Sequence, residues 1–259
     1  MRMTTTAPCI FCKTTSGPFE RAEHIVPESL GNVDDILLPG AVCDRCNQYF
    51  GSKVESPVLA RTIVGALRAA HGVPTKKGRM STFTCPSLTI EGYRDGYGSL
   101  SLDQSLVWLT PTAPSERYTA VIPQDPDEDL LLTRLMLKMG LEYLTTSGFA
   151  DPLSSRFDAA RTFARRPRPG SSYSIAEGCL PLDEISLMTL DDVGPVEELK
   201  QYCYRLHGEP ALGYVFHFCY YFLHLCVPLT PELDFLEYVT DFNGLNPGLP
   251  PCVVRKPHA

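Results

Sequence analysis

The hydrophobic positions near the amino terminus first follow a helical period. One face is apolar because aliphatic residues recur at every fourth position: Leu59, Ile63 and Leu67. Pro57 suits the first position of a helix, and Gly72 suits a residue just after its end. The pattern therefore predicts a single helix over Ser56–Ala70.

The middle of the chain changes from strand-like to helical periodicity. Strand-forming stretches separated by glycine-containing turns predict strands at Met80–Thr84, Leu88–Arg94 and Gly98–Leu109. Asp125 and Pro126 then give a helix-start signal. Leu130–Tyr143 is apolar nearly all round, which predicts a buried helix. Another helix is expected over Asp151–Arg166.

The last third has strand-like composition. Strands are predicted at Ile185–Leu190, Leu199–Leu206 and Gly213–Val227, the last as one long buried strand or as two pieces. His217 and His224 are seven positions apart, which places them on opposite faces of a regular strand. We therefore interpret them as packed or partly exposed strand residues and not as a joint metal site. The predicted class is α+β, with a mixed helix and antiparallel-sheet region towards the carboxyl end.

Composition indicates a folded chain with an uneven charge distribution. The 259 residues are 44% hydrophobic and 20% charged, which excludes a disordered tail, a collagen and a coiled coil. The formal net charge of −7 argues against nucleic-acid binding by the surface as a whole. However, residues 1–80 carry ten basic and seven acidic side chains, so the amino-terminal part is mildly basic.

The ten cysteines raise the question of metal binding. The chain begins without the apolar stretch of a secretory signal, and its most apolar run is too short to span a membrane. We therefore expect a cytoplasmic protein with reduced thiols and no membrane partner. Two Cys-x-x-Cys pairs, separated by 30 residues, match the spacing of a tetrahedral structural Zn²⁺ site: Cys9, Cys12, Cys43 and Cys46. The other six cysteines are interpreted as core residues.

Between the two pairs the chain reads Glu23-His24-Ile25-Val26-Pro27, and Asn47 follows the last cysteine directly. In these motifs, from Cys9 to about Glu55, the sequence resembles the HNH (ββα-metal) endonucleases. The resemblance implies a ββα module with a structural zinc. It makes His24 the general base, and Glu23 and Asn47 the ligands of a catalytic Mg²⁺ or Mn²⁺ ion. Such oxygen ligands suit either ion, and a neutral imidazole suits the role of base at neutral pH.

The chain departs from the family pattern at one position. The family's middle Asn, which stabilises the loop and orients the His, would fall within residues 36–42, where no Asn occurs. Asn32 is present but lies closer to His24 in the sequence, which leaves the partner of that imidazole open, with a backbone carbonyl as one candidate. Glu55 is either a supporting group behind the site or an ordinary solvated carboxylate.

The Gly72–Gly78 stretch divides the predicted domains. Residues 1–72 form the nuclease module, and residues 73–259 form an α+β region expected to recognise the substrate or a partner. Basic side chains predicted to contact nucleic acid are Lys76, Lys77, Arg161, Arg165 and Arg166.

The leading hypothesis is a metal-dependent endonuclease acting on DNA. RNA remains open as a substrate, and a homodimer is compatible with the sequence. Two alternatives stand beside it. One is a non-catalytic zinc module that binds nucleic acid or protein, and the other is an HNH scaffold repurposed for other metal-assisted chemistry.

Overall fold

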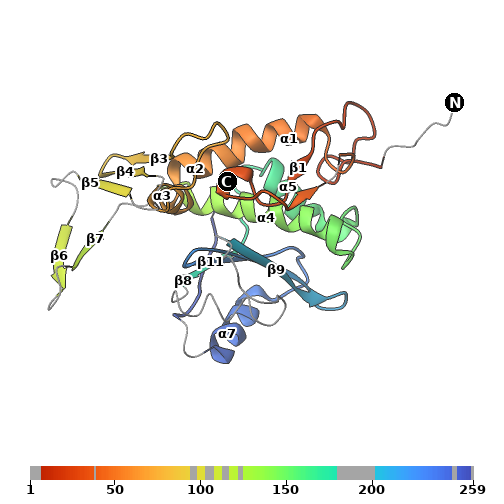
Figure 1. The fold of residues 1–259 in the computed structure, drawn as a ribbon. Coiled ribbons are helices and arrows are strands. Elements are labelled where there is room, and N and C mark those ends of the chain that lie inside the picture. Colours follow the sequence, from red (N-terminus) through yellow and green to blue (C-terminus); the bar gives the residue numbers. More distant parts are fainter. Residues whose placement is uncertain are drawn as a thin grey trace, which may run out of the picture.

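Helix α4 (Glu128–Ser147) lies across the middle of the molecule, between the amino-terminal helices and a five-stranded antiparallel sheet (Figure 1). The computed structural model describes residues 7–37, 39–93, 98–102, 108–112, 117–121, 125–179, 202–246 and 250–257. Helix α7 (Phe235–Leu245) covers the other face of the sheet. Mixed helices and antiparallel sheets confirm the predicted α+β class.

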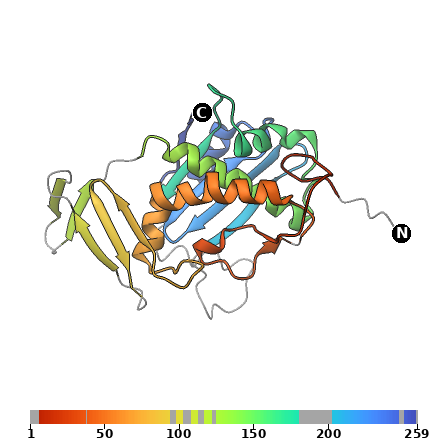
Figure 2. The ribbon, with the colours of Figure 1, turned by 90° about the horizontal axis from the view of Figure 1, so that it is seen from above.

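The amino-terminal module has the order strand, strand, helix. Strand β1 (Glu23–His24) pairs antiparallel with β2 (Ile36–Leu37), and a 3-10 turn at Glu28–Leu30 lies between them. Helix α1 (Asp44–Phe50) follows. Seen from above, the amino-terminal helices cross over α4 and the strands of the large sheet (Figure 2). The ββα arrangement implied by the family resemblance is therefore present.

The helix predicted over Ser56–Ala70 differs from the structure at both its start and its middle. The helical segment begins at α1 and continues through a π-helical turn (Gly51–Glu55) into α2 (Ser56–Arg61). Thr62 is extended, and a separate helix α3 (Ile63–Ala70) follows, with Gly72 in the left-handed conformation after its end.

Pro57 explains the π-helical turn. Proline has no N–H group and so leaves the carbonyl of Lys53, four residues earlier, without its helical donor. The Arg134 guanidinium on α4 donates to that carbonyl at 3.3 Å. The contact from Arg134 thus supplies the hydrogen bond that Pro57 removes. Proline is otherwise expected at the start of a helix, and here it lies within a continuous helical segment.

Helix α4 is buried as predicted but begins later, with Asp127 as the residue before its first turn. Asp125 and Asp127 bind the Arg61 guanidinium at 2.7–2.9 Å, which holds them in a turn ahead of the helix. The helix predicted at Asp151–Arg166 is shorter: a 3-10 turn (Ser155–Phe157) precedes α5 (Asp158–Arg165).

The large sheet has the order β12-β8-β11-β10-β9. Its strands are β8 (Ile175–Cys179), β9 (Tyr202–Glu209), β10 (Gly213–Tyr220), β11 (Leu223–Pro228) and β12 (Val253–Arg255). The stretch predicted as one strand or two pieces is a hairpin, with residues 221–222 at its turn. The predictions at Ile185–Leu190 and at residues 199–201 fall outside the described residues.

The hairpin corrects the prediction for its two histidines. His217 and His224 lie on the same face, with His217 Nδ1 3.0 Å from His224 Nε2, because the chain reverses direction between them. Both are buried beneath α7, where Tyr238 Oη lies 2.7 Å from His217 Nε2 and Cys252 Sγ lies 3.5 Å from His224 Nδ1. Burial lowers the pKa of both histidines, that of His224 to about 4.

A smaller three-stranded sheet extends to one side of α3 (Figure 2). It consists of β3 (Thr82–Cys85), β4 (Leu88–Gly92) and β5 (Gly98–Leu102). A separate pair, β6 (Trp108–Thr112) and β7 (Arg117–Val121), follows. The single strand predicted at Gly98–Leu109 is thus divided between β5 and β6.

One hydrophobic core passes through the boundary predicted at residue 72. Buried side chains of the amino-terminal module, such as Phe50 and Val54, belong to the same cluster as Leu132 on α4 and Phe216 on β10. The two predicted regions are therefore packed together and do not have separate cores. Among the described residues, no helix is both long and apolar enough to cross a membrane.

Candidate active site and zinc centre

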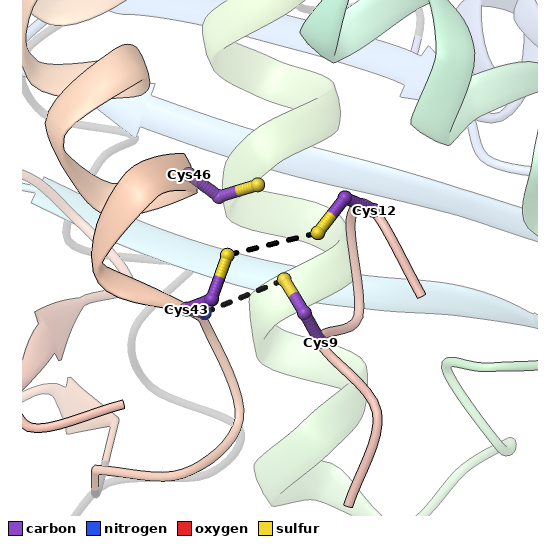
Figure 3. A group of neighbouring side chains, drawn as sticks. All are labelled: Cys9, Cys12, Cys43 and Cys46. Carbon is purple, nitrogen blue, oxygen red and sulfur yellow. Dashed lines mark hydrogen bonds between the residues drawn. The ribbon is translucent and has the colours of Figure 1, made fainter. Parts of the chain in front are cut away.

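Four cysteine side chains from the two Cys-x-x-Cys pairs converge on one point (Figure 3). The Sγ atoms of Cys9, Cys12, Cys43 and Cys46 all lie within 4.8 Å of one another. Cys12 Sγ lies 3.6 Å from Cys43 Sγ, and the backbone N–H of Cys43 donates to Cys9 Sγ at 3.4 Å. A hydrogen bond with Cys46 lowers the pKa of Cys9 to about 4, which favours a thiolate there. The donor set fits one tetrahedral zinc ion.

Short backbone hydrogen bonds shape each cysteine pair. Lys13 N–H donates to Cys9 O at 2.8 Å, with Lys13 in the left-handed conformation at φ 57°. Cys43 is the N-cap residue of α1, and its carbonyl accepts from Cys46 N–H at 2.8 Å and from Asn47 N–H at 3.0 Å. The cysteine cluster therefore fixes the start of α1, and with it the position of Asn47.

Arg161 supports the first cysteine pair and is not available to a ligand. Its guanidinium donates to the carbonyls of Ile10 and Pro152 and pairs with Asp158, and the residue is only 4% exposed. Burial lowers the pKa of the guanidinium. The expectation that Arg161 contacts nucleic acid is wrong, because its donors are used inside the protein.

The other four predicted nucleic-acid contacts differ in their surroundings. Lys76 and Lys77 are exposed, and Lys76 Nζ lies 3.2 Å from Glu28 Oε2, just beyond the Glu23-His24 motif. Arg165 is half-buried at the end of α5. Arg166 is exposed, and its guanidinium lies over the ring of Tyr49 on α1, 5.8 Å from the ring centroid. Lys76 and Arg166 thus each contact the amino-terminal module.

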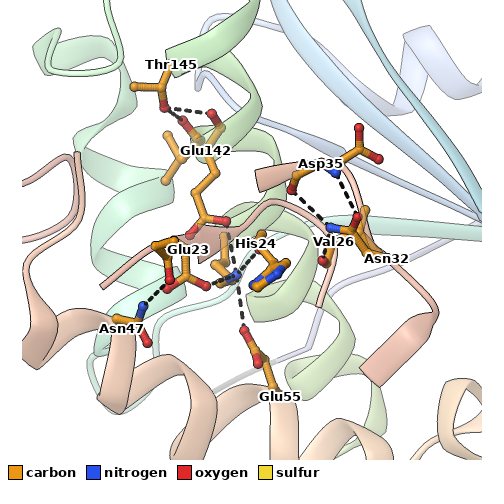
Figure 4. Close-up of polar contacts among 12 residues, drawn as sticks. Glu23, His24, Val26, Asn32, Asp35, Asn47, Glu55, Glu142 and Thr145 are labelled. Carbon is orange, nitrogen blue, oxygen red and sulfur yellow. Dashed lines mark hydrogen bonds and ion pairs between the residues drawn. The ribbon is translucent and has the colours of Figure 1, made fainter. Parts of the chain in front are cut away.

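Glu23, His24 and Asn47 meet at the junction of β1 and α1 (Figure 4). The Asn47 side-chain amide donates to the carbonyl of Ala22 at 3.2 Å, which ties the first turn of α1 to the residue before β1. Glu23 is buried, His24 is half-buried, and β1 ends at His24. The structure brings together the three residues that the resemblance assigned to the reaction.

Lys138 on α4 completes this site, and sequence reasoning missed it. Its Nζ atom lies 2.7 Å from Glu23 Oε1, 3.1 Å from Glu55 Oε1 and 3.0 Å from Glu142 Oε2, and it donates to the His24 carbonyl at 2.9 Å. Lys138 and Glu142 are both 0% exposed. Glu55 is accordingly ion-paired and 15% exposed, and not a solvated carboxylate. A signal was present: Arg134, Lys138 and Glu142 recur at every fourth position within a mostly apolar stretch of helix.

The charges around Lys138 do not balance. Burial alone would lower the pKa of this ammonium group, but the three carboxylates outweigh burial and raise it well above its usual value. Burial, together with the other two carboxylates, raises the pKa of Glu142. Glu23 Oε2 is buried and has no hydrogen-bond partner among the described residues. The three carboxyl groups around Lys138 therefore offer more oxygens than this one ammonium group can pair with.

Asn32 stabilises the loop between β1 and β2. Its amide donates to the carbonyls of Val26 at 2.6 Å and Asp35 at 3.0 Å, and its oxygen accepts from Asp35 N–H at 2.8 Å and from Tyr202 Oη at 3.0 Å. The residue is 1% exposed. Asn32 thus supplies the loop-stabilising contacts that the family assigns to a later Asn, although none of these bonds reaches the His24 ring.

One comparison with known proteins found a match for this part of the chain. Residues 9–62 match a protein-family model described as HNH endonuclease. This segment includes both cysteine pairs, the Glu23-His24 motif, Asn47 and Glu55. No curated protein and no solved structure gave a match to the chain.

Proposed function

Residues 9–62 match the HNH endonuclease family model, and from this premise we propose that the protein is a metal-dependent endonuclease that hydrolyses phosphodiester bonds of DNA. The observation that carries the proposal is the convergence of Glu23, His24 and Asn47 beside a helix whose start is fixed by the cysteine cluster. At the family level, the match itself indicates a nuclease with a nucleic-acid substrate.

The residues present fit a divalent cation. Glu23 offers a buried carboxylate oxygen, Oε2, without a protein partner in the described part of the chain. The Asn47 amide nitrogen is used by the Ala22 carbonyl, so its oxygen is the donor atom left for a ligand. Hard oxygen donors with room for water and phosphate suit Mg²⁺ or Mn²⁺. When bound, such an ion neutralises charge on the phosphate and on the leaving oxygen.

His24 is the proposed general base. Its backbone is held on both sides, by pairing with Ile36 in β2 and by the hydrogen bond from Lys138 to its carbonyl. The imidazole makes no hydrogen bond to any described residue and is half-buried, so water can reach it. A neutral imidazole here would accept the proton of the attacking water as the new phosphorus–oxygen bond forms and the bond from phosphorus to the leaving oxygen breaks.

Exposed basic side chains next to the module would bind the phosphate backbone. Lys76, Lys77 and Arg166 are exposed, and Lys76 and Arg166 contact residues of the module directly. DNA is the proposed substrate and RNA the alternative. Residues 73–259 are proposed to recognise the substrate or a partner, and a homodimer would place two such sites together for cleavage of both strands.

A non-catalytic zinc module is the second candidate function. The observation that favours it is the ion pair between Glu23 and Lys138, since a carboxylate already held by a buried ammonium group has one oxygen fewer for a metal. In this reading the cysteine cluster and the basic side chains bind nucleic acid, and the Glu23-His24 pair is structural. An HNH scaffold used for other metal-assisted chemistry is tested by the same experiment.

A cleavage assay separates these functions. Zinc-loaded protein is incubated with supercoiled plasmid, linear duplex or RNA in the presence of Mg²⁺ or Mn²⁺. His24→Ala should lower the rate by about 10²–10⁴-fold, because a general base is lost, while zinc content stays unchanged. His207→Ala, a half-buried histidine on β9, is the matched control and should cleave like the parent. Cleavage by His24→Ala at the parent rate would refute the assignment, and inactivity of the parent on every substrate would favour the binding module.

A further inference from the structure

Lys138 is a fully buried cation at the candidate site. Its side chain is 0% exposed, and it comes from α4, well outside the segment that matches the family model. A buried ammonium group loses several kcal/mol of hydration and is stable only with close, well-oriented partners. The contacts of Lys138 therefore show what this group does in the structure.

Those contacts include both members of the Glu23-His24 pair. The ammonium nitrogen lies 2.7 Å from Glu23 Oε1 and donates to the His24 carbonyl at 2.9 Å. Glu55, at the end of the π-helical turn, and Glu142, one turn further along α4, share its charge. One side chain thus joins β1, the helix that carries Asn47, and α4.

The two oxygens of Glu23 have different surroundings as a result. Oε1 is held by Lys138, whereas Oε2 is buried without a hydrogen-bond partner among the described residues. A carboxylate fixed through one oxygen cannot rotate freely, so the direction of the second oxygen is set in advance. Outer groups that orient a metal ligand in this way typically change metal affinity or activity by about 10–100-fold when they are removed.

We propose that Lys138 is a positioning residue for the divalent-ion site, which holds Glu23 through Oε1 so that Oε2 is presented to the ion. This inference rests on the proposed function of the same site. It assigns to α4 a direct part in a site that the family match places within residues 9–62. The site within the HNH segment is then incomplete without Lys138, which lies on a helix much later in the chain.

The positive charge of Lys138 by itself weakens cation binding, whereas its hold on Glu23 strengthens it. These opposite effects make the proposal testable. If Lys138 were only a nearby positive charge, its removal would strengthen cation binding, because Glu23 and Glu55 would keep their negative charges. If it positions Glu23, its removal weakens cation binding, because the ligand loses its fixed orientation. The sign of the change in Mn²⁺ affinity decides between the two.

The choice of variant must protect the fold. Lys138→Met alone leaves three carboxylates without their cation, and breaking a buried pair from one side typically costs about 3–5 kcal/mol. The double variant Lys138→Met/Glu142→Leu replaces the fully buried ion pair with apolar side chains, a change that is often neutral, and leaves Glu23 and Glu55 as the remaining carboxylates. Arg134→Met is the matched control, since Arg134 is a buried cation one turn earlier on α4 that contacts Tyr49 and not Glu23.

Mn²⁺ binding to the zinc-loaded full chain is measured by electron paramagnetic resonance, from the loss of the signal of free Mn²⁺, together with thermal unfolding. The double variant should fold, retain zinc and bind Mn²⁺ about 10–100-fold more weakly than the parent. Arg134→Met should lose stability but keep the parent affinity. Glu23→Gln should weaken binding in the parent and change little in the double variant, because the two changes act on one ligand.

Equal or tighter Mn²⁺ binding by a folded double variant would overturn the positioning role, and so would a parent that binds no Mn²⁺. A parent that binds Mn²⁺ in a Lys138-dependent manner yet cleaves no nucleic acid would uphold this inference and refute the proposed function. The two proposals therefore fail separately.

Discussion

Removing the Asn32 side chain should destabilise the β1–β2 loop by a predictable amount. Asn32 is 1% exposed and makes four hydrogen bonds, but truncation to Ala does not leave four groups without partners. The Asp35 carbonyl still accepts from Ile25 N–H, and Tyr202 Oη still lies 2.8 Å from Asp35 Oδ2. Only the Val26 carbonyl and the Asp35 N–H lose every partner that the structure shows.

The expected loss follows from these two groups. Each buried polar group without a partner costs about 1–3 kcal/mol. Asp35 is half-buried, so water can reach its N–H, and the sum falls near the lower end, at about 3 kcal/mol. At about 2–4 °C per kcal/mol for a chain near this size, the unfolding temperature should fall by about 6–12 °C.

Two further variants sharpen this experiment. Asn32→Asp keeps the shape and the accepting oxygen but places a second oxygen against the Val26 carbonyl, where the amide now lies at 2.6 Å. It should therefore destabilise at least as much as Asn32→Ala. Asn246→Ala is the control, because Asn246 is half-buried and makes one hydrogen bond, to the Phe242 carbonyl.

Thermal unfolding of the zinc-loaded protein, followed by circular dichroism, measures all three variants. If Asn32→Ala or Asn32→Asp unfolds within about 1 kcal/mol of the Asn246→Ala control, the count of unpartnered groups is wrong. The loop would then have another source of stability.

Two other predictions concern the cysteine cluster and the buried histidines. Elemental analysis of Cys43→Ser should find well below one zinc ion per chain. The variant should also be less stable, because metal binding in such sites contributes directly to folding. A stable Cys43→Ser protein with full zinc would contradict this. Burial lowers the pKa of His224 to about 4, below its usual value of about 6.5, so the unfolded chain takes up a proton first as the pH falls. The free energy of unfolding should therefore fall by about 3 kcal/mol between pH 6.5 and 4 through this group. Chemical denaturation across that range should show a correspondingly smaller fall in His224→Phe. Equal pH dependence in both proteins would refute the assignment.

The sequence predicted the parts of the site that depend on short spacing. Cysteine pairs at Cys-x-x-Cys separation and an adjacent Glu23-His24 pair are local patterns, and the structure places them together. Lys138 was not predicted, since its partners on β1 lie more than a hundred positions away. The only local signal was a set of charged residues at every fourth position in a mostly apolar stretch of helix.

The hairpin between β10 and β11 was ambiguous for a different reason. Its turn, Tyr221-Phe222, contains none of the residues that usually mark a reversal. Tyr221 adopts a left-handed φ of 52°, and its ring stacks on His71 with the centroids 3.5 Å apart. A contact with a distant helix end thus supports a backbone conformation that the local sequence does not favour.

The position of Lys138 along the chain also has a consequence for synthesis. A ribosome adds about 5–20 residues per second, so roughly 4–15 s separate the end of the family segment at residue 62 from the arrival of Lys138. During that interval both cysteine pairs already exist and can take up zinc, whereas Glu23 has no ammonium partner from α4. The proposed nuclease site is therefore assembled only after much of the chain has left the ribosome, and the nascent protein passes through a stage in which the four cysteines are present while Glu23 and His24 are not yet held by Lys138.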